Sequence, residues 1–185
     1  QKRGRAAKPI TVAGDHWRVE AELPGISRAG EIVVVGAHYD SVADCPGAND
    51  NGSGVAAMLA IAQAFTGTEN MRTLRFVAFA NEEPPYFRTD AMGSLVYARD
   101  CRRRGEDIVG MISLESLGCY SDEENSQRFP PGLRKFYPDT GNFVGIIGDQ
   151  NSKELVEMFY RSFRRVSDFP AQKAALPPEI PGIGW

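Results

Sequence analysis

EIVVVGAHYDSVADCPGANDNGSGVAAMLAIAQAF, residues 31–65, is the stretch that indicates the fold class. Its first part, EIVVVGAHYD, is a continuous run rich in β-branched residues, which predicts a strand buried on both faces of a sheet. Its last part, GVAAMLAIAQAF, is long and apolar and follows a glycine and a serine, which predicts a helix. A buried strand that leads into a helix is typical of α/β proteins.

The same alternation of strands and helices continues on both sides of this stretch. Strand patterns occur in HWRVEAELPG (16–25), TLRFVAFA (73–80), IVGMISLESLG (108–118) and GNFVGIIGD (141–149). Helix patterns occur in GSLVYARDCRRRG (93–105) and in SKELVEMFYRSFRRV (152–166), where we expect Ser152 to cap the helix. Residues 120–140 and 169–185 show neither pattern and are expected to be loops. The sequence therefore predicts an α/β fold: a three-layer sandwich with a mixed, largely parallel sheet and helices on both faces.

Composition narrows the class of protein. With 185 residues, of which 42% are hydrophobic and 24% charged, the chain can bury one sizeable core, and we expect a single domain over residues 1–185. The net charge of −3 argues against a nucleic-acid partner, because the phosphate backbone favours an excess of Lys and Arg. No apolar run reaches about 18 residues, so no membrane span is expected.

The sequence does not decide the disulfide state of the cysteines or the oligomeric state of the protein. Cys45, Cys101 and Cys119 are too few for a disulfide framework. One disulfide bond with one free thiol, or three thiols, both remain open.

Acidic and imidazole side chains follow three of the predicted buried strands at their carboxyl ends. His38 and Asp40 end the first, Glu82 and Glu83 follow the second, and Glu115 follows the third. Ligands of open α/β sheets bind outside the carboxyl ends of the strands, so we expect these side chains to meet at one edge. Asp50, in the loop after the first strand, is expected to join them.

This set of side chains predicts a metal site. Carboxylates held close together repel one another unless a cation lies among them. One imidazole with several carboxylate oxygens suits a divalent metal, zinc foremost, and an aspartate can bridge two ions. Asp40 is a candidate to hold the second ring nitrogen of His38 and so fix its tautomer.

Each residue also has a purely structural explanation. Asp50 could cap the helix that follows, Glu82 and Glu83 could be solvated at a strand end, and Glu115 could be an exposed loop residue. The hypothesis that all of these structural explanations hold at once, for residues at one sheet edge, is weaker than the hypothesis of a metal site. His16, on an early polar strand, is not expected to bind metal.

The motifs GAHYDS, GANDNGSG, FANEE and MISLESLG resemble the successive signatures of metallopeptidase family 28. These co-catalytic zinc exopeptidases include bacterial leucyl-type aminopeptidases and are related to glutaminyl cyclases. The resemblance covers residues 19–118 and, more loosely, continues to residue 149. It implies the zinc-exopeptidase (phosphorylase/hydrolase-like) fold, two zinc ions in an intact site, a peptide substrate with a free N-terminus, and a secreted or periplasmic location rather than a cytoplasmic one.

The resemblance also implies roles for single residues, including a cis peptide bond after Asp50. His38 would bind the first zinc, Asp50 would bridge both ions and Glu83 would bind the second. Glu82 would be the general base that activates a water held between the ions. Glu115 would complete the first site, although the most familiar members have an aspartate there. The assignments to test are thus catalytic roles for Glu82 and Asp40 and metal binding by His38, Asp50, Glu83 and Glu115.

One feature departs from the family pattern. The family completes its second metal site with a histidine far down the chain, and no histidine follows His38 here. We therefore expect that the sequence stops before this ligand. We expect the protein of this length to bind one zinc ion or none, and its activity stays open. A glutaminyl-cyclase-like acyltransferase and a non-catalytic binding domain on the same fold remain as alternatives.

Overall fold

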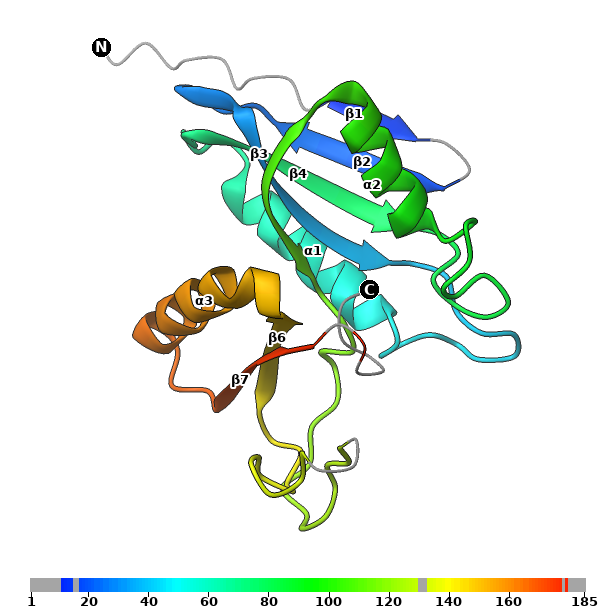
Figure 1. Ribbon diagram of the computed structural model, residues 1–185, viewed down its shortest axis with the longest axis vertical. Helices are drawn as coiled ribbons and strands as arrows, with labels where there is room; N and C mark the ends of the chain where they lie inside the picture. The colour runs from blue at the N-terminus through cyan, green and yellow to red at the C-terminus, as the bar shows by residue number, and fades with distance from the viewer. Residues whose placement is uncertain (1–10, 15–16, 130–132, 178, 180–185) are drawn as a thin grey trace. The chain divides into compact units, whose positions relative to one another are not determined.

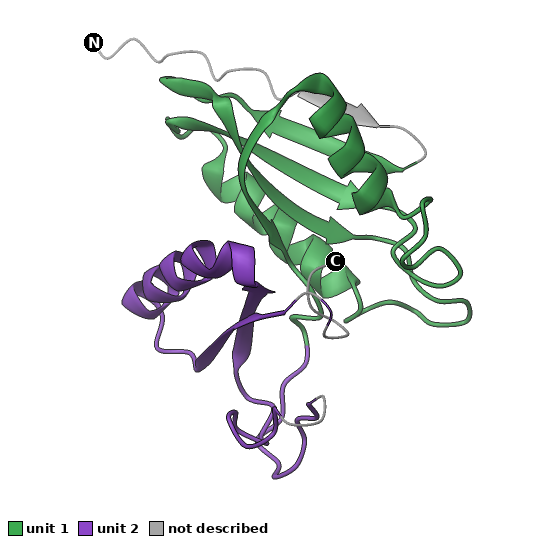
Figure 2. Ribbon diagram, in the orientation of Figure 1, with its two compact units in different colours: residues 1–118 green, residues 119–185 purple. Residues whose placement is uncertain are grey.

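The computed structural model describes residues 11–14, 17–129, 133–177 and 179 of the chain. In chain order its elements are β1 (Thr11–Gly14), β2 (Arg18–Leu23), β3 (Arg28–His38), α1 (Gly52–Phe65), β4 (Arg72–Phe79), α2 (Gly93–Arg104), β5 (Asp107–Ser113), β6 (Val144–Asp149), a 3-10 turn (Gln150–Ser152), α3 (Lys153–Val166) and β7 (Ala171–Leu176) (Figure 1). The chain divides into two compact units, residues 1–118 and residues 119–185 (Figure 2). A single catalytic domain over 1–185 stays a prediction.

The first unit is built on a mixed sheet with the strand order β1-β2-β4-β3-β5. β3 pairs in parallel with both of its neighbours, with Val34 opposite Arg75 of β4 and Val35 opposite Ile112 of β5. β2 pairs antiparallel with β4, and β1 pairs antiparallel with β2. The carboxyl ends of β3, β4 and β5 therefore lie at the same edge of the sheet.

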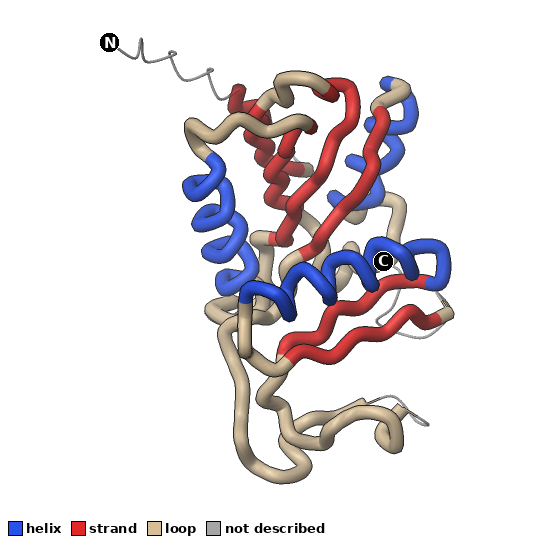
Figure 3. The backbone as a smooth tube through the Cα atoms, turned by 90° about the vertical axis from the view of Figure 1, so that its left-hand side faces the viewer, coloured by secondary structure: helices blue, strands red, loops and turns tan. Residues whose placement is uncertain are grey.

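Helices cover both faces of this sheet, as the sequence predicts (Figures 1 and 3). Because successive side chains of a strand point to opposite faces, β3 contributes to two separate cores. The core under α1 contains Val35, Ala37, Met58 and Phe76. The core under α2 contains Ile32, Val34, Val77, Phe79, Tyr97 and Cys101. The three-layer α/β arrangement is thereby confirmed.

A buried ion-pair cluster ties α2 to the sheet. The guanidinium of Arg75, whose side chain is 9% exposed, lies 2.7 Å from Glu106 and 2.8 Å from Glu22, and it donates to the hydroxyl of Tyr97 at 3.1 Å. Arg104 lies 2.9 Å from the same Glu106 carboxylate. Burial opposes ionisation of Glu106, but the hydrogen bonds from Arg104 and Arg75 outweigh it and lower the pKa to about 2. The cluster joins β2, β4 and α2 to the start of β5.

The second unit holds two parallel strands, β6 and β7, packed on α3. Its core consists of Ile146, Val156 and Ala171, with aromatic residues of α3 around them. Two expectations were wrong here. The segment after residue 169 is not all loop, because β7 pairs with β6, with Lys173 opposite Ile146. Ser152 makes no side-chain capping bond; instead the Asp149 carboxylate accepts the Ser152 N–H at 2.8 Å.

The described residues show three further features. Residues 120–129 and 133–140 contain no helix or strand. Within the described part of the chain, no helix has both the length and the apolar character needed to cross a bilayer. All three cysteines are free thiols, with Cys101 buried and the other two exposed.

Candidate metal centre

The side chains at the carboxyl edge of the first unit's sheet surround the ring of His38. β3 ends at His38, whose side chain is only 4% exposed. Its Nε2 atom lies 3.0 Å from Asp50 Oδ1, 3.3 Å from Glu115 Oε2 and 3.8 Å from Glu82 Oε2. The loop after β3, the end of β4 and the end of β5 thus each place a carboxylate against one imidazole.

Three of the predicted ligands form a group tight enough to share an ion. His38, Asp50 and Glu83 each offer one ligand atom, and these atoms all lie within 4.8 Å of one another. Glu115 reaches the group through its contact with the His38 ring. An imidazole with carboxylate oxygens is a donor set that zinc accepts, so the residues present fit the metal that the sequence predicts. Their individual roles stay predictions.

The electrostatics of the group show why a cation would be stabilised there. Burial raises the pKa of Glu82, and the charges of Glu83 and Glu115 raise it further. Burial also raises the pKa of Glu83, with Asp50 as the largest charge effect. Carboxylates that resist ionisation in this way gain most from a neighbouring positive charge.

The imidazole of His38, when protonated, is one such positive charge. Burial alone would lower its pKa, but the hydrogen bond to Glu115 and the charges of Glu115, Glu82 and Asp40 raise it to about 9. Burial opposes ionisation of Glu115, and its hydrogen bonds with His38 and Ser116 outweigh this and lower its pKa. A metal ion would take the place of the imidazolium proton.

Asp40 does more than the sequence indicates. Its carboxylate accepts the backbone N–H of Glu82 at 3.2 Å and that of Glu83 at 3.0 Å. The Nδ1 atom of His38 lies 3.2 Å from the Asp40 backbone oxygen and 3.5 Å from the carboxylate. Asp40 therefore links the histidine of one strand to the two glutamates of the next. Nothing in the sequence points to the bonds with Glu82 and Glu83, because they join residues far apart in the chain.

The loop before α1 contains a residue that sequence reasoning missed. The N-cap of α1 is Asn51, whose Oδ1 accepts the Gly54 N–H, so Asp50 is not the helix cap. The Asp50–Asn51 peptide bond is cis, as the resemblance implies. Asn51 also contacts the end of β5, including Glu115. The sequence signal that could have found it is an asparagine immediately before the glycine at which the helix begins, because asparagine is a preferred N-cap residue.

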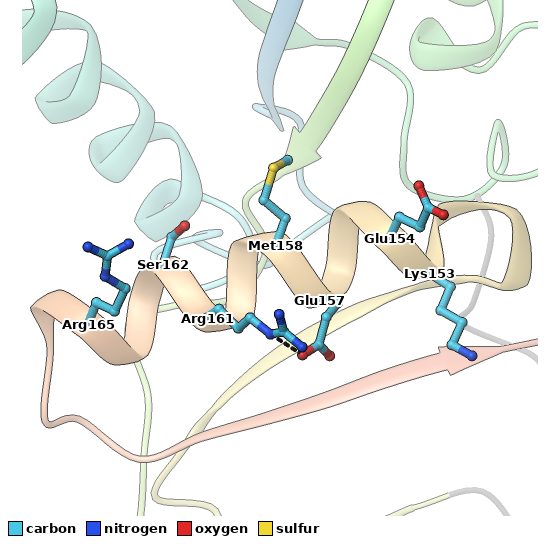
Figure 4. A pocket seen from close by; sticks show the side chains of 7 residues that line it. All are labelled: Lys153, Glu154, Glu157, Met158, Arg161, Ser162 and Arg165. Carbon is cyan, nitrogen blue, oxygen red and sulfur yellow. Dashed lines mark hydrogen bonds and ion pairs between the residues drawn. The ribbon is translucent and has the colours of Figure 1, made fainter.

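Two further features are the second histidine of the sequence and a surface hollow in the second unit. His16 lies outside the described residues. A hollow in the second unit runs along one face of α3 (Figure 4) and is lined by Lys153, Glu154, Glu157, Met158, Arg161, Ser162 and Arg165. Its acidic and basic side chains partly neutralise each other, as the 2.6 Å ion pair between Glu157 and Arg161 shows. We assign it no function.

The sequence model of one protein family, Peptidase family M28, matches residues 18–174. The uncharacterized protein YfbL of Escherichia coli is 35% identical over 165 residues, which cover 84% of this chain and 50% of YfbL. Aminopeptidase YwaD of Bacillus subtilis is 51% identical over 53 residues, covering 29% of this chain and 12% of YwaD. The chain therefore spans half or less of the length of these relatives.

A solved structure shows the same fold. The crystal structure of Legionella pneumophila LapA aminopeptidase superposes with a TM-score of 0.66 at 15% sequence identity. The match covers 94% of this chain and 43% of LapA. At this identity the likeness concerns the fold alone.

Proposed function

Because the chain belongs to peptidase family M28, we propose that it carries the catalytic centre of a zinc-dependent aminopeptidase, which hydrolyses the N-terminal peptide bond of peptides. The observation that supports this most is the group formed by His38, Asp50 and Glu83 at the carboxyl edge of the sheet, with ligand atoms within 4.8 Å. The name of the relative YwaD, an aminopeptidase, supports the reaction type.

The chain's own residues divide into two sets of ligands. His38, Asp50 and Glu115 would hold a first ion, and Asp50 and Glu83 would offer carboxylates to a second. The first set would combine an imidazole with carboxylates, whereas the second would have carboxylates alone among the described residues. When bound, zinc supplies a Lewis acid that polarises the scissile carbonyl and lowers the pKa of the attacking water.

Glu82 is the residue placed for proton transfer. Its Oε2 atom lies 3.8 Å from His38 Nε2, beside the proposed ligands. Burial raises the pKa of its carboxyl group, which makes it a better proton acceptor near neutral pH. Glu82 takes the proton from the attacking water and passes it to the leaving amine. General acid–base catalysis of this kind contributes about 10²- to 10⁴-fold to the rate.

Asp40 keeps this base in place. Its carboxylate accepts the backbone N–H groups of Glu82 and Glu83, so the backbone that carries the base and the neighbouring ligand is held at one point. A fixed distance between the base and the reacting water is what such a step requires.

The test measures metal content and turnover separately. The zinc-loaded protein is assayed on a panel of aminoacyl-4-nitroanilides and on an N-terminal glutaminyl peptide. We expect release of nitroaniline, and we expect Glu82→Gln to abolish it while bound zinc stays unchanged. Glu124→Gln, at an exposed position of the second unit, is the matched control.

Three outcomes would contradict the proposal. Bound zinc without turnover of any of these substrates would contradict the proposed aminopeptidase activity. Cyclisation of the glutaminyl peptide in place of hydrolysis would identify an acyltransferase. Loss of zinc in Glu82→Gln would make Glu82 a ligand rather than the base.

A further inference from the structure

Asn51 occupies a buried position between two elements that carry proposed metal ligands. Its side chain is among the largest that are fully buried, with 1% of the residue exposed. On one side it follows Asp50 and caps α1, where its Oδ1 accepts the Gly54 N–H at 3.1 Å. On the other side it reaches the residues after β5, which include Glu115. One amide therefore connects the loop of Asp50 with the strand end of Glu115.

Every hydrogen-bonding position of this amide is used. Its Nδ2 donates to the Leu114 carbonyl at 2.9 Å and to Glu115 Oε2 at 3.0 Å. Its Oδ1 accepts from Gly54 N at 3.1 Å and from Ser116 N at 3.2 Å. The partners fix which end of the amide is oxygen, because two of them are N–H groups and two are oxygens. Aspartate has the same shape but no donor, and serine is too short to reach Glu115.

Glu115 is a side chain that needs such support. It is half exposed, and it has one more rotatable bond than an aspartate would have at this place. Its Oε2 accepts from Asn51 and lies 3.3 Å from His38, while its Oε1 accepts from the Ser116 hydroxyl at 2.8 Å. These contacts hold the carboxylate against the imidazole.

We propose that Asn51 is a positioning residue for the first metal site: its amide donor holds the Glu115 carboxylate in the orientation that binds the ion. The proposal rests on the metal centre of the proposed function. It predicts that metal affinity depends on the donor of Asn51 and not only on the helix cap that the same side chain provides.

Neighbouring residues offer a matched control. Ser53 Oγ accepts the Leu117 N–H at 2.8 Å, and Asn49 Oδ1 accepts the Gly118 N–H at 2.7 Å. These bonds tie the same helix start to the same loop without touching Glu115. Ser53→Ala therefore weakens the loop but leaves the proposed positioning intact.

The decisive variant is Asn51→Asp, in which the two acceptor bonds remain and both donor bonds, to the Leu114 carbonyl and to Glu115, are lost. A negative charge added near a cation would by itself tighten metal binding. The proposed positioning role of Asn51 predicts weaker metal binding instead, because an oxygen without a proton would face Glu115 Oε2 and repel it. We expect the dissociation constant for Co²⁺, followed by its visible absorption, and for Zn²⁺, by competition, to rise about 10- to 100-fold. Asn51→Ser, which keeps a cap without adding charge, is expected to show the same loss.

A double variant tests whether Asn51 acts through Glu115. Combining Asn51→Asp with Glu115→Gln restores the hydrogen bond with donor and acceptor exchanged, and it leaves the net charge of the pair as in the wild type. We expect the double variant to bind Co²⁺ no more weakly than Glu115→Gln alone. Thermal unfolding is recorded for every variant, so that a general loss of folding is recognised.

Each result either supports or overturns the proposal. It is supported if Asn51→Asp and Asn51→Ser bind metal more weakly, Ser53→Ala binds as the wild type does, and the loss disappears in the Glu115→Gln background. It is overturned if Asn51→Asp binds equally or more tightly, if Ser53→Ala weakens binding by the same factor, or if the loss persists beside Glu115→Gln. A wild-type chain that binds no Co²⁺ would refute the metal centre and this proposal together.

Discussion

Replacing Glu106 by glutamine should make the stability of the protein less sensitive to acid. Glu106 precedes β5 and binds Arg75 and Arg104 with a side chain that is only 18% exposed. Its pKa in the folded chain is about 2, compared with an ordinary value of 4.5, because its two arginine partners outweigh the effect of burial. A group whose pKa is lowered by folding stabilises the folded state while it is ionised in both states.

The magnitude follows from these two pKa values. Each pKa unit corresponds to 1.36 kcal/mol, so the ionised carboxylate stabilises the fold by about 3 kcal/mol. This contribution is complete above pH 4.5, the ordinary pKa, and is lost as the pH falls from there toward 2. We therefore expect Glu106→Gln to be less stable than the wild type by about 3 kcal/mol at neutral pH, with a difference that shrinks in acid.

Urea unfolding followed by circular dichroism, at a series of pH values from 7 down to 3, measures this difference. The carboxylates of the metal centre titrate in both proteins, so their effect cancels in the comparison. Glu124→Gln, at an exposed position, is the control and should follow the wild type at every pH. A Glu106→Gln variant that is as stable as the wild type at pH 7, or a difference that stays constant down to pH 3, would refute the reasoning.

Three further predictions concern other parts of the first unit. Asp40→Asn can accept only one of the N–H groups of Glu82 and Glu83, so we expect kcat on an aminoacyl-nitroanilide to fall while thermal stability drops by about 1–3 kcal/mol; unchanged kcat would contradict this. Gly93→Ala would place a Cβ atom 2.2 Å from the Ala80 carbonyl oxygen, and thermal denaturation should show a loss of about 1–3 kcal/mol or more; a variant as stable as the wild type would exclude this clash. Zinc at a free concentration 100 times its dissociation constant should stabilise the chain by about 2.7 kcal/mol, reversed by a chelator, and a melting temperature independent of zinc would argue against the metal centre.

Local sequence patterns predicted the strands and helices well where the pattern was strong. The apolar runs of β3 and β4 and the helix patterns of α1, α2 and α3 correspond to observed elements. β7 was missed because its sequence, AQKAAL, has few of the residues that favour strands. It is a strand because it pairs with β6, which is a tertiary effect that no local pattern reports.

The candidate site likewise has features that the sequence predicted and features that it did not. The residue types at the ends of the strands predicted which side chains gather around His38, because parallel neighbouring strands end at the same edge of a sheet. The hydrogen bonds of Asp40 with Glu82 and Glu83, and of Asn51 with Glu115, were not predicted. They join residues that are 42 to 64 positions apart, and the sequence contains no record of which atoms meet.

The sequence by itself determined the α/β class through its local periodicity and indicated the family through the resemblance of its motifs. It also predicted a candidate set of metal-binding side chains through the chemistry of each residue. Only the tertiary structure decided that the buried amide of Asn51 holds Glu115, that Asp40 binds the backbone of its neighbours, and that the pKa of His38 rises to about 9. These properties depend on distances of a few ångströms and on burial, and both are set by how the strands pair and the helices pack.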